Sequence, residues 1–112
     1  MSTESFLNEE EMILGIAYSI NHVPIRLTDE RWEHILNSHP ELSHSDMGAI
    51  LDAVEDPEYI LPGYGKTLIA VIVLAKASFL HVVYREVKKD DGFIVTAGIR
   101  PRMSKKKIVW RK

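Results

Sequence analysis

The segment TDERWEHILNSHPEL, residues 28–42, carries the clearest helical pattern of this 112-residue chain. Thr28 is suited to cap the helix, because its hydroxyl can accept a hydrogen bond from a free backbone N–H, and the two acidic residues after it complement the positive end of the helix dipole. Pro40 disfavours a helical conformation at the residue before it. We therefore predict a helix that begins after Thr28 and ends before Pro40. One side of it is mostly apolar, with Trp32, Ile35, Leu36 and His39 at helical spacing.

Two of the five histidines lie in this segment. His39 continues the apolar stripe, whereas His34 lies at its border. They are five residues apart, which places them about 140° apart around a helix, so they cannot share a metal ion as two histidines one turn apart do. The sequence gives no support for a metal site, and we expect no cofactor.

The flanking segments extend the helical part of the chain. Residues 12–20 fit a helical stripe, and residues 20–27 are typical of extended chain leading into Thr28. Ser43 can cap a second helix that ends before Pro57. We predict an N-terminal tail or extra helix over residues 1–22 and a single α+β domain over residues 23–112.

The second half of the chain is typical of strands. Short β-branched or alternating segments at residues 59–61, 66–76, 78–87, 93–99 and 108–110 are separated by turn residues such as Asp91-Gly92. Helices first and an antiparallel meander afterwards predict an α+β fold with the helices on one face of the sheet. The sequence Gly63-Tyr64-Gly65-Lys66-Thr67 is no phosphate-binding loop, because the first glycine of that motif is missing and a strand follows instead of a helix.

Composition and charge bound the functional classes. The chain has no cysteine, which excludes disulfides and thiolate metal sites, and its longest apolar run, residues 68–75, is far shorter than the roughly 20 residues of a membrane helix. We expect a soluble cytoplasmic protein without a membrane partner. Residues 1–62 contain 2 basic and 13 acidic side chains, a net charge of −11, and residues 63–112 contain 12 basic and 3 acidic ones, a net charge of +9. The basic half could attract phosphates, or the two halves could simply attract each other across the fold.

Strand alternation predicts a polar group on one face of the sheet. If Leu80, Val82 and Tyr84 face the helices, His81 and Arg85 face away, and Thr96 and Arg100 can join them from the next strand. In that strand we expect one face to carry Phe93, Val95, Ala97 and Ile99, and the other to carry Ile94, Thr96, Gly98 and Arg100.

This group of side chains suits metal-independent cleavage of RNA. An imidazole can take the 2′-hydroxyl proton, guanidinium groups can stabilise the charged phosphorus intermediate, and an acid can protonate the leaving oxygen. We assign the substrate phosphates to Lys66, Lys76, Arg100 and Arg102. The alternative is that His81 is a half-buried strand histidine and Arg85 a solvated charge, with His39 a histidine at the border of the core.

Several short motifs resemble the phage- and toxin-associated branch of the barnase–EndoU–colicin–RelE-like nuclease group. They are PIRLTDERWEHI at residues 24–35, SHPEL at 38–42, DPEYI at 56–60 and FIVTA at 93–97. The resemblance implies two helices packed on a mainly antiparallel sheet of about four strands. It also implies a metal-independent ribonuclease acting as a toxin, with His34, His39, basic strand residues and Thr96 as the site candidates.

These expectations leave two functions open. The first is a toxin-like ribonuclease domain that cleaves RNA through a 2′,3′-cyclic phosphate, with catalytic residues His34, His39, His81, Arg85 and Thr96 and an acidic antitoxin as a possible protein partner. The second is a catalytically inactive nuclease-like module that holds nucleic acid or an acidic protein. Asn37-Ser38 precede His39 where an arginine is common in the group, which keeps the second function open.

Overall fold

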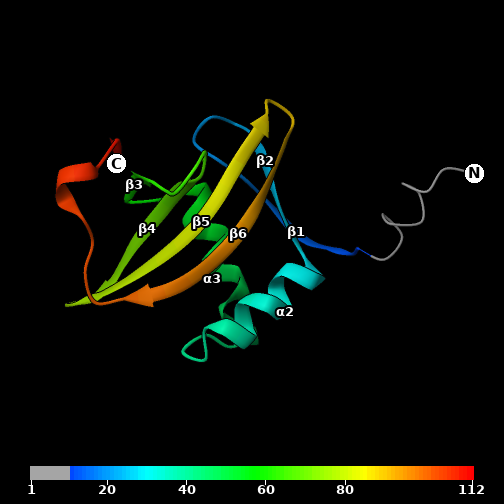
Figure 1. The fold of residues 1–112 in the computed structure, drawn as a ribbon, viewed down its shortest axis with the longest axis horizontal. Coiled ribbons are helices and arrows are strands. Elements are labelled where there is room, and N and C mark those ends of the chain that lie inside the picture. Colours follow the sequence, from blue (N-terminus) through cyan, green and yellow to red (C-terminus); the bar gives the residue numbers. More distant parts are fainter. Residues whose placement is uncertain (1–10) are drawn as a thin grey trace, which may run out of the picture.

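A computed structural model describes residues 11–112, and its central element is a seven-stranded sheet (Figure 1). The strand order is β1-β2-β6-β5-β4-β3-β7. All neighbouring strands are antiparallel except β2 and β6, which form a short parallel pair. The strands are β1 Ile13–Tyr18, β2 Pro24–Thr28, β3 Tyr59–Pro62, β4 Leu68–Ala75, β5 Ser78–Lys88, β6 Asp91–Arg100 and β7 Trp110–Arg111.

The helical elements are fewer than the strands. They are α2 Asp29–Ser38, η1 His44–Asp46, α3 Met47–Glu55 and η2 Lys105–Lys107. None of the helices formed by residues 11–112 is long and apolar enough to cross a membrane.

The prediction of two N-terminal helices on a mainly antiparallel sheet of about four strands is wrong, because the sheet is mixed and has seven strands. The largest error lies at residues 12–20, where the expected helix is the edge strand β1. Its apolar residues fit a helical repeat, but Ala17 is buried while Ile16 and Tyr18 are exposed, which is the alternation of a strand. Pairing with β2 therefore overrode the helical pattern. Residues 1–10, part of the predicted tail, lie outside the described residues.

The prediction of a helix capped by Thr28 is confirmed. The Thr28 hydroxyl accepts a hydrogen bond from the backbone N–H of Arg31 at 3.3 Å, and α2 ends at Ser38, with His39 as its C-cap. Trp32 and Ile35 are buried in the main core. The second predicted helix forms as α3, but Ser43 caps the short turn η1 before it, where Asp46 Oδ2 accepts the Ser43 backbone N–H at 2.8 Å.

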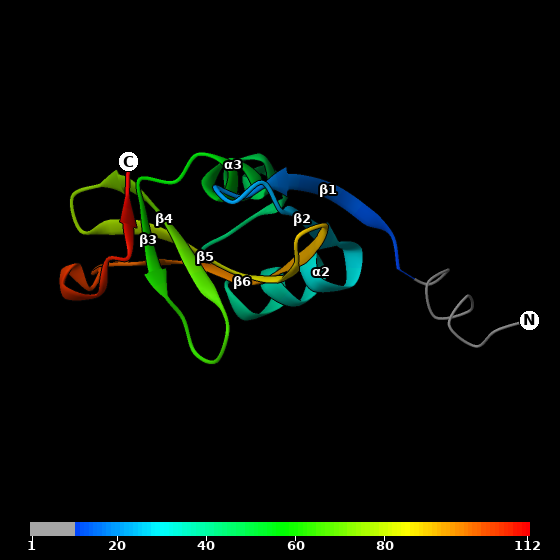
Figure 2. The ribbon, with the colours of Figure 1, turned by 90° about the horizontal axis from the view of Figure 1, so that it is seen from above.

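The two helices do not share one face of the sheet as expected. Helix α3 packs on the face formed by β1, β5 and β4, whereas α2 lies alongside β6 (Figure 2). On that side β6 pairs with β2 only at Gly92 and Phe93, so most of its edge is available to α2. We call the sheet face away from α3 the open face. Figure 2 shows that the β3–β4 turn and η2 project on this side of the sheet.

Strand alternation in β5 is as predicted. Leu80, Val82 and Tyr84 are buried on the α3 side, so His81, Val83 and Arg85 face the open face. The predicted alternation of β6 is wrong at its start. Val83 pairs with Thr96 but Tyr84 pairs with Ile94, so one extra residue bulges out. The bulge turns Ile94 into the core and Phe93 to the open face.

Tyr84 offers a stability test of this core. Its side chain is fully buried, and its hydroxyl has no hydrogen-bond partner among residues 11–112. Burial, with a smaller effect of Glu86, also raises the pKa of this hydroxyl far above its ordinary value. We expect Tyr84→Phe to raise the free energy of unfolding by about 1 kcal/mol, because it removes a buried polar atom that lacks a partner. Chemical denaturation measures this, with Tyr84→Leu, which leaves a cavity, as the destabilised control. A clear loss of stability in Tyr84→Phe would contradict the prediction.

Candidate functional site

A pocket of about 350 Å³ lies on the open face, between the sheet and the C-terminal segment. Strands β3, β4 and β5 form its apolar floor. Residues 102–107 form the rim, because the chain turns back over the sheet after β6 and passes through η2 before pairing as β7 with β3. The lining residues are Leu61, Pro62, Ile69, His81, Val83, Arg100, Arg102, Ser104 and Lys107.

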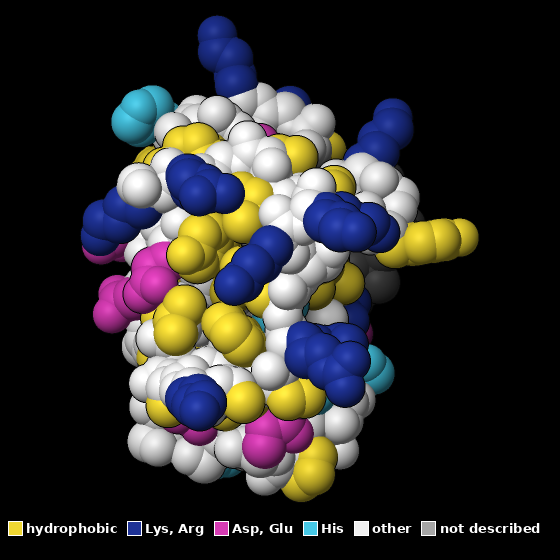
Figure 3. All heavy atoms as spheres, turned by 90° about the vertical axis from the view of Figure 1, so that its left-hand side faces the viewer, with side chains coloured by type: hydrophobic (Ala, Val, Ile, Leu, Met, Phe, Trp, Pro, Cys, Tyr) yellow, Lys and Arg dark blue, Asp and Glu magenta, His cyan; other side chains and the backbone are white. Residues whose placement is uncertain are grey.

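Three cations line this pocket and no carboxylate does. Arg100 comes from the end of β6, and Arg102 and Lys107 come from the rim. Within residues 11–112, the only ion pairs between Lys or Arg and a carboxylate are Arg26–Asp91 and Lys112–Asp56. The three pocket cations therefore repel one another, and a bound anion would relieve that repulsion. Figure 3 shows this end of the molecule, where Lys and Arg side chains surround a group of hydrophobic ones.

His81 is the one titratable group on the floor of the pocket. Its side chain is 8% exposed, and Nδ1 lies 3.2 Å from the carbonyl oxygen of Phe79. A carbonyl can only accept a hydrogen bond, so Nδ1 carries the proton and Nε2 keeps its lone pair. Burial lowers the pKa of His81, and the charge of Arg100 lowers it further, against the opposing effect of the Phe79 hydrogen bond. At neutral pH His81 is therefore an uncharged proton acceptor.

His39 reaches the open face from the end of α2. A side chain at Gly98 would meet the His39 ring at 2.9 Å, so the absence of one leaves room for the imidazole. Gly98 pairs with His81 across the strands, and paired residues point to the same face. The two imidazoles therefore lie on one face of neighbouring strands.

Glu41 holds His39 in this position. Its Oε2 lies 3.3 Å from His39 Nδ1 and also accepts the Ile99 backbone N–H at 3.1 Å. Desolvation opposes ionisation of Glu41, but hydrogen bonds from its own backbone and from Ile99, together with His39, outweigh it and lower the pKa of this carboxyl. Since Nδ1 is engaged, Nε2 is the His39 nitrogen left for a substrate.

The structure brings together only part of the predicted site. His81, Arg100 and Arg102 line one pocket, and His39 lies beside it. Arg85 and Thr96 are on the same face but outside the lining, and Arg85, four residues beyond His81, is displaced along β5 by about 13 Å. His34 is exposed on α2, where it lines a separate hollow with other residues of that helix. Lys66 and Lys76 lie at opposite ends of β4, so they cannot hold the same phosphate.

Sequence reasoning missed three residues of this site. Ser104 and Lys107 follow β6, where strand alternation no longer assigns a face, and only the return of the chain to β3 places them over His81. Glu41 is two residues after His39 in the SHPEL motif, so the sequence could have indicated a contact between their side chains. The hydrogen bond from the Ile99 backbone N–H to Glu41 could not be predicted from the sequence.

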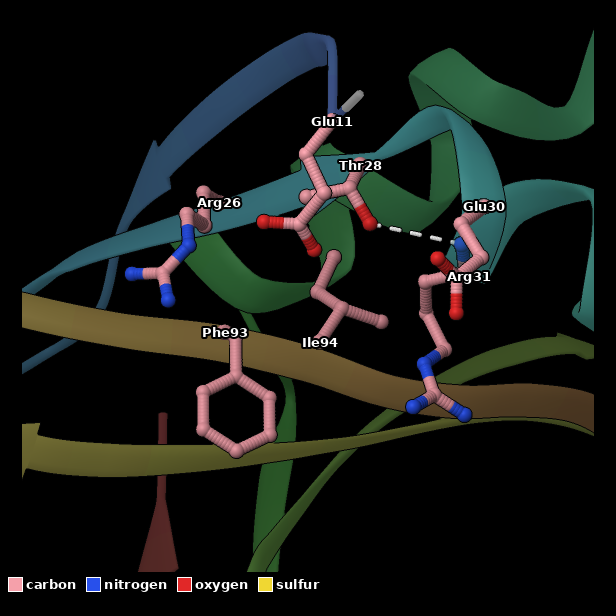
Figure 4. Close-up of a pocket in the computed structure, with 7 residues that line it drawn as sticks. All are labelled: Glu11, Arg26, Thr28, Glu30, Arg31, Phe93 and Ile94. Carbon is pink, nitrogen blue, oxygen red and sulfur yellow. Dashed lines mark hydrogen bonds between the residues drawn. The ribbon is translucent and has the colours of Figure 1, made fainter. Parts of the chain in front are cut away.

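A second pocket, of about 210 Å³, lies where β2, the start of α2 and β6 meet (Figure 4). Its charges are mixed, because Glu11 and Glu30 line it together with Arg26 and Arg31. Arg26 is also paired with Asp91 and lies 5.8 Å from the centre of the Phe93 ring. This pocket is therefore less suited to a polyanion than the pocket around His81. Residues 11–112 contain no cluster of three or more His, Asp or Glu side chains that could hold a metal ion.

The lowered pKa of His81 predicts a pH dependence of stability. The folded protein binds fewer protons than the unfolded chain between the folded pKa and the ordinary value of 6.5. The stabilising contribution is therefore complete above about pH 6.5 and is lost as the pH falls through this window. Denaturant unfolding at pH 7.5 and pH 5 should show the loss, and His81→Asn should reduce its size. An equal loss in this variant would assign the effect to other groups.

Comparisons with protein-family models, curated proteins and solved structures found no match to this chain.

Proposed function

We propose that this protein is a metal-independent endoribonuclease that cleaves RNA through a 2′,3′-cyclic phosphate, with the open face as its active site. The observation that carries the proposal is the uncharged His81 imidazole on the floor of a pocket with three cations and no carboxylate. A phosphodiester satisfies both features, since its charge pairs with the cations and a neighbouring hydroxyl offers a proton to the base. The resemblance of the motifs at residues 24–35, 38–42, 56–60 and 93–97 to the nuclease group is a second reason to propose this reaction.

The residues divide the reaction between them. Nε2 of His81 accepts the 2′-hydroxyl proton, and the 2′-oxygen attacks phosphorus. Arg100 and Arg102 stabilise the negative charge that gathers on the phosphoryl oxygens. His39, oriented by Glu41, gives a proton to the 5′-oxygen as the bond from phosphorus to that oxygen breaks. The products are a 2′,3′-cyclic phosphate and a free 5′-hydroxyl. This reaction fits the biological role of a toxin that acts on cytoplasmic RNA. An acidic antitoxin would inhibit it by binding to the open face.

Cleavage of a defined single-stranded RNA in the presence of EDTA tests the proposal. We expect fragments that end in a 2′,3′-cyclic phosphate, and no cleavage at a position where a single 2′-deoxynucleotide has been placed. Arg100→Ala with Arg102→Ala should weaken cleavage strongly. The matched control, Lys88→Ala with Lys89→Ala, removes the same charge from the exposed end of the β5–β6 hairpin, away from the pocket. RNA that stays intact with folded protein would rule the proposal out.

The second candidate is a non-catalytic module that binds RNA. The low exposure of His81 favours it, because a substrate hydroxyl must reach a nitrogen that is largely covered by neighbouring residues. This candidate predicts binding that weakens steeply with salt without any product.

A further inference from the structure

The β3–β4 turn presents an aromatic ring to solvent on the open side of the sheet. Tyr64 is 99% exposed, more than any other large hydrophobic residue of the described chain. Tyr64 therefore adds nothing to the core, and its ring is accessible to a ligand.

The turn that carries Tyr64 is held by its own hydrogen bonds. The Gly63 N–H donates to the Thr67 carbonyl at 2.9 Å, and the Thr67 hydroxyl donates to the Tyr64 carbonyl at 2.7 Å. Gly65 has a φ of +67°, which glycine adopts at little cost. A side chain at Gly63 would overlap the Thr67 hydroxyl. The backbone under Tyr64 is therefore ordered before any ligand binds.

The turn lies beside the pocket around His81. The strands that it joins supply Leu61, Pro62 and Ile69 to the pocket lining, and Figure 2 shows the turn projecting on the same side of the sheet as η2. Lys66 is exposed in the turn itself. Arg85 follows Tyr84, which pairs with Leu68 where the turn enters β4. An exposed ring next to these cations has the composition of a surface that holds single-stranded nucleic acid, where bases stack on aromatic rings and cations follow the backbone.

We infer that an unpaired base of the RNA stacks on the Tyr64 ring. A phosphate of the same RNA occupies the pocket around His81. The inference rests on the proposed function and adds a substrate class to it, namely single-stranded RNA. A base in a duplex is stacked and paired on both sides, so it cannot lie on the Tyr64 ring without being extruded. The turn therefore selects against duplex RNA. Lys66, which cannot share a phosphate with Lys76, has a role here in holding the backbone next to the stacked base.

Binding of a 2′-O-methyl RNA oligonucleotide tests this inference, because that RNA keeps its bases and phosphates but lacks the hydroxyl that starts cleavage. Tyr64→Ala loses the ring on which one base stacks, so its Kd for the single strand should be roughly 5- to 100-fold higher than that of the wild type. Tyr64→Phe keeps the ring and should stay within about 2-fold of the wild type. Binding of inorganic pyrophosphate, followed through the NMR signals of His81, should be the same in all three proteins.

The outcomes separate this inference from the proposed function. Wild-type affinity in Tyr64→Ala, with cleavage still present, would overturn the stacking role and leave the ribonuclease in place. An equal loss of affinity for single-stranded and duplex RNA would also overturn it. Wild-type protein that neither binds nor cleaves RNA would remove both proposals. Quenching of Tyr64→Trp fluorescence by the oligonucleotide would directly support the stacked base.

Discussion

Replacing His81 with glutamine should lower the rate constant of RNA cleavage by about 100- to 10,000-fold, the contribution that a general base makes. Glutamine is similar in size and polar, so the pocket can keep its shape, but it cannot accept the 2′-hydroxyl proton at neutral pH. Single-turnover cleavage with enzyme in excess measures the rate constant of the chemical step. In the wild type this rate constant should fall on the acid side with a midpoint below 6.5, because burial lowers the pKa of His81.

His34→Gln is the matched control for this experiment. His34 was also predicted from the sequence to be catalytic, and the same substitution is made there. In the structure, however, His34 is exposed in a separate hollow on α2. We expect wild-type cleavage from this variant. The opposite result, with loss of activity in His34→Gln and none in His81→Gln, would move the active site from the open face to the outer side of α2.

Replacing Ile50 with alanine should lower the free energy of unfolding by about 2–5 kcal/mol, as expected for truncating a fully buried isoleucine. Ile50 is 0% exposed on α3, which packs against β1, β4 and β5. Hairpin β1–β2 joins the rest of the sheet through only two residue pairs with β6, so α3 is a main connection between the two parts. With a total stability of about 5–15 kcal/mol, this single change can unfold much of the population at physiological temperature.

Denaturant unfolding followed by circular dichroism measures the effect of Ile50→Ala. The control is Asp52→Ala, two residues along the same helix, where the side chain is exposed and makes no hydrogen bond to residues 11–112. It should change the free energy of unfolding by no more than about 0.5 kcal/mol. Similar effects in both variants would mean that helix propensity, not burial of Ile50, is what the substitution changes.

Some elements were readable in the sequence because their signals are local. Helix α2 has a cap, an apolar stripe and a proline stop within residues 28–40, and all three act between near neighbours. In strand β5, Leu80, Val82 and Tyr84 recur at every second position, so Leu80 and His81 were assigned to the correct faces. Where a competing pattern was present, the local signal misled. Residues 12–20 fit a helix, yet pairing with β2 and packing under α3 made them a strand.

The candidate site depended more on distant contacts. Alternation in β6 gave Thr96, Gly98 and Arg100 the correct face, but the bulge near Val95 exchanged Phe93 and Ile94. A bulge results from how two strands fit together, so no pattern within one strand reveals it. His34 and His39 had similar motif support. Only the position of α2 beside β6 showed that His39 lies over Gly98, the residue paired with His81, whereas His34 lies in a separate hollow.

The sequence by itself determined where α2 begins and ends, which side of β5 is apolar, and that most of the positive charge lies in the second half of the chain. These properties depend on residue type and on spacing over a few positions. Only the tertiary structure decided that the sheet has seven strands, that the chain after β6 folds back to place Arg102 and Lys107 over His81, and that His39 lies over Gly98. Each of these results from contacts between residues far apart in the chain, whose free energies are set by packing and pairing that no local pattern contains.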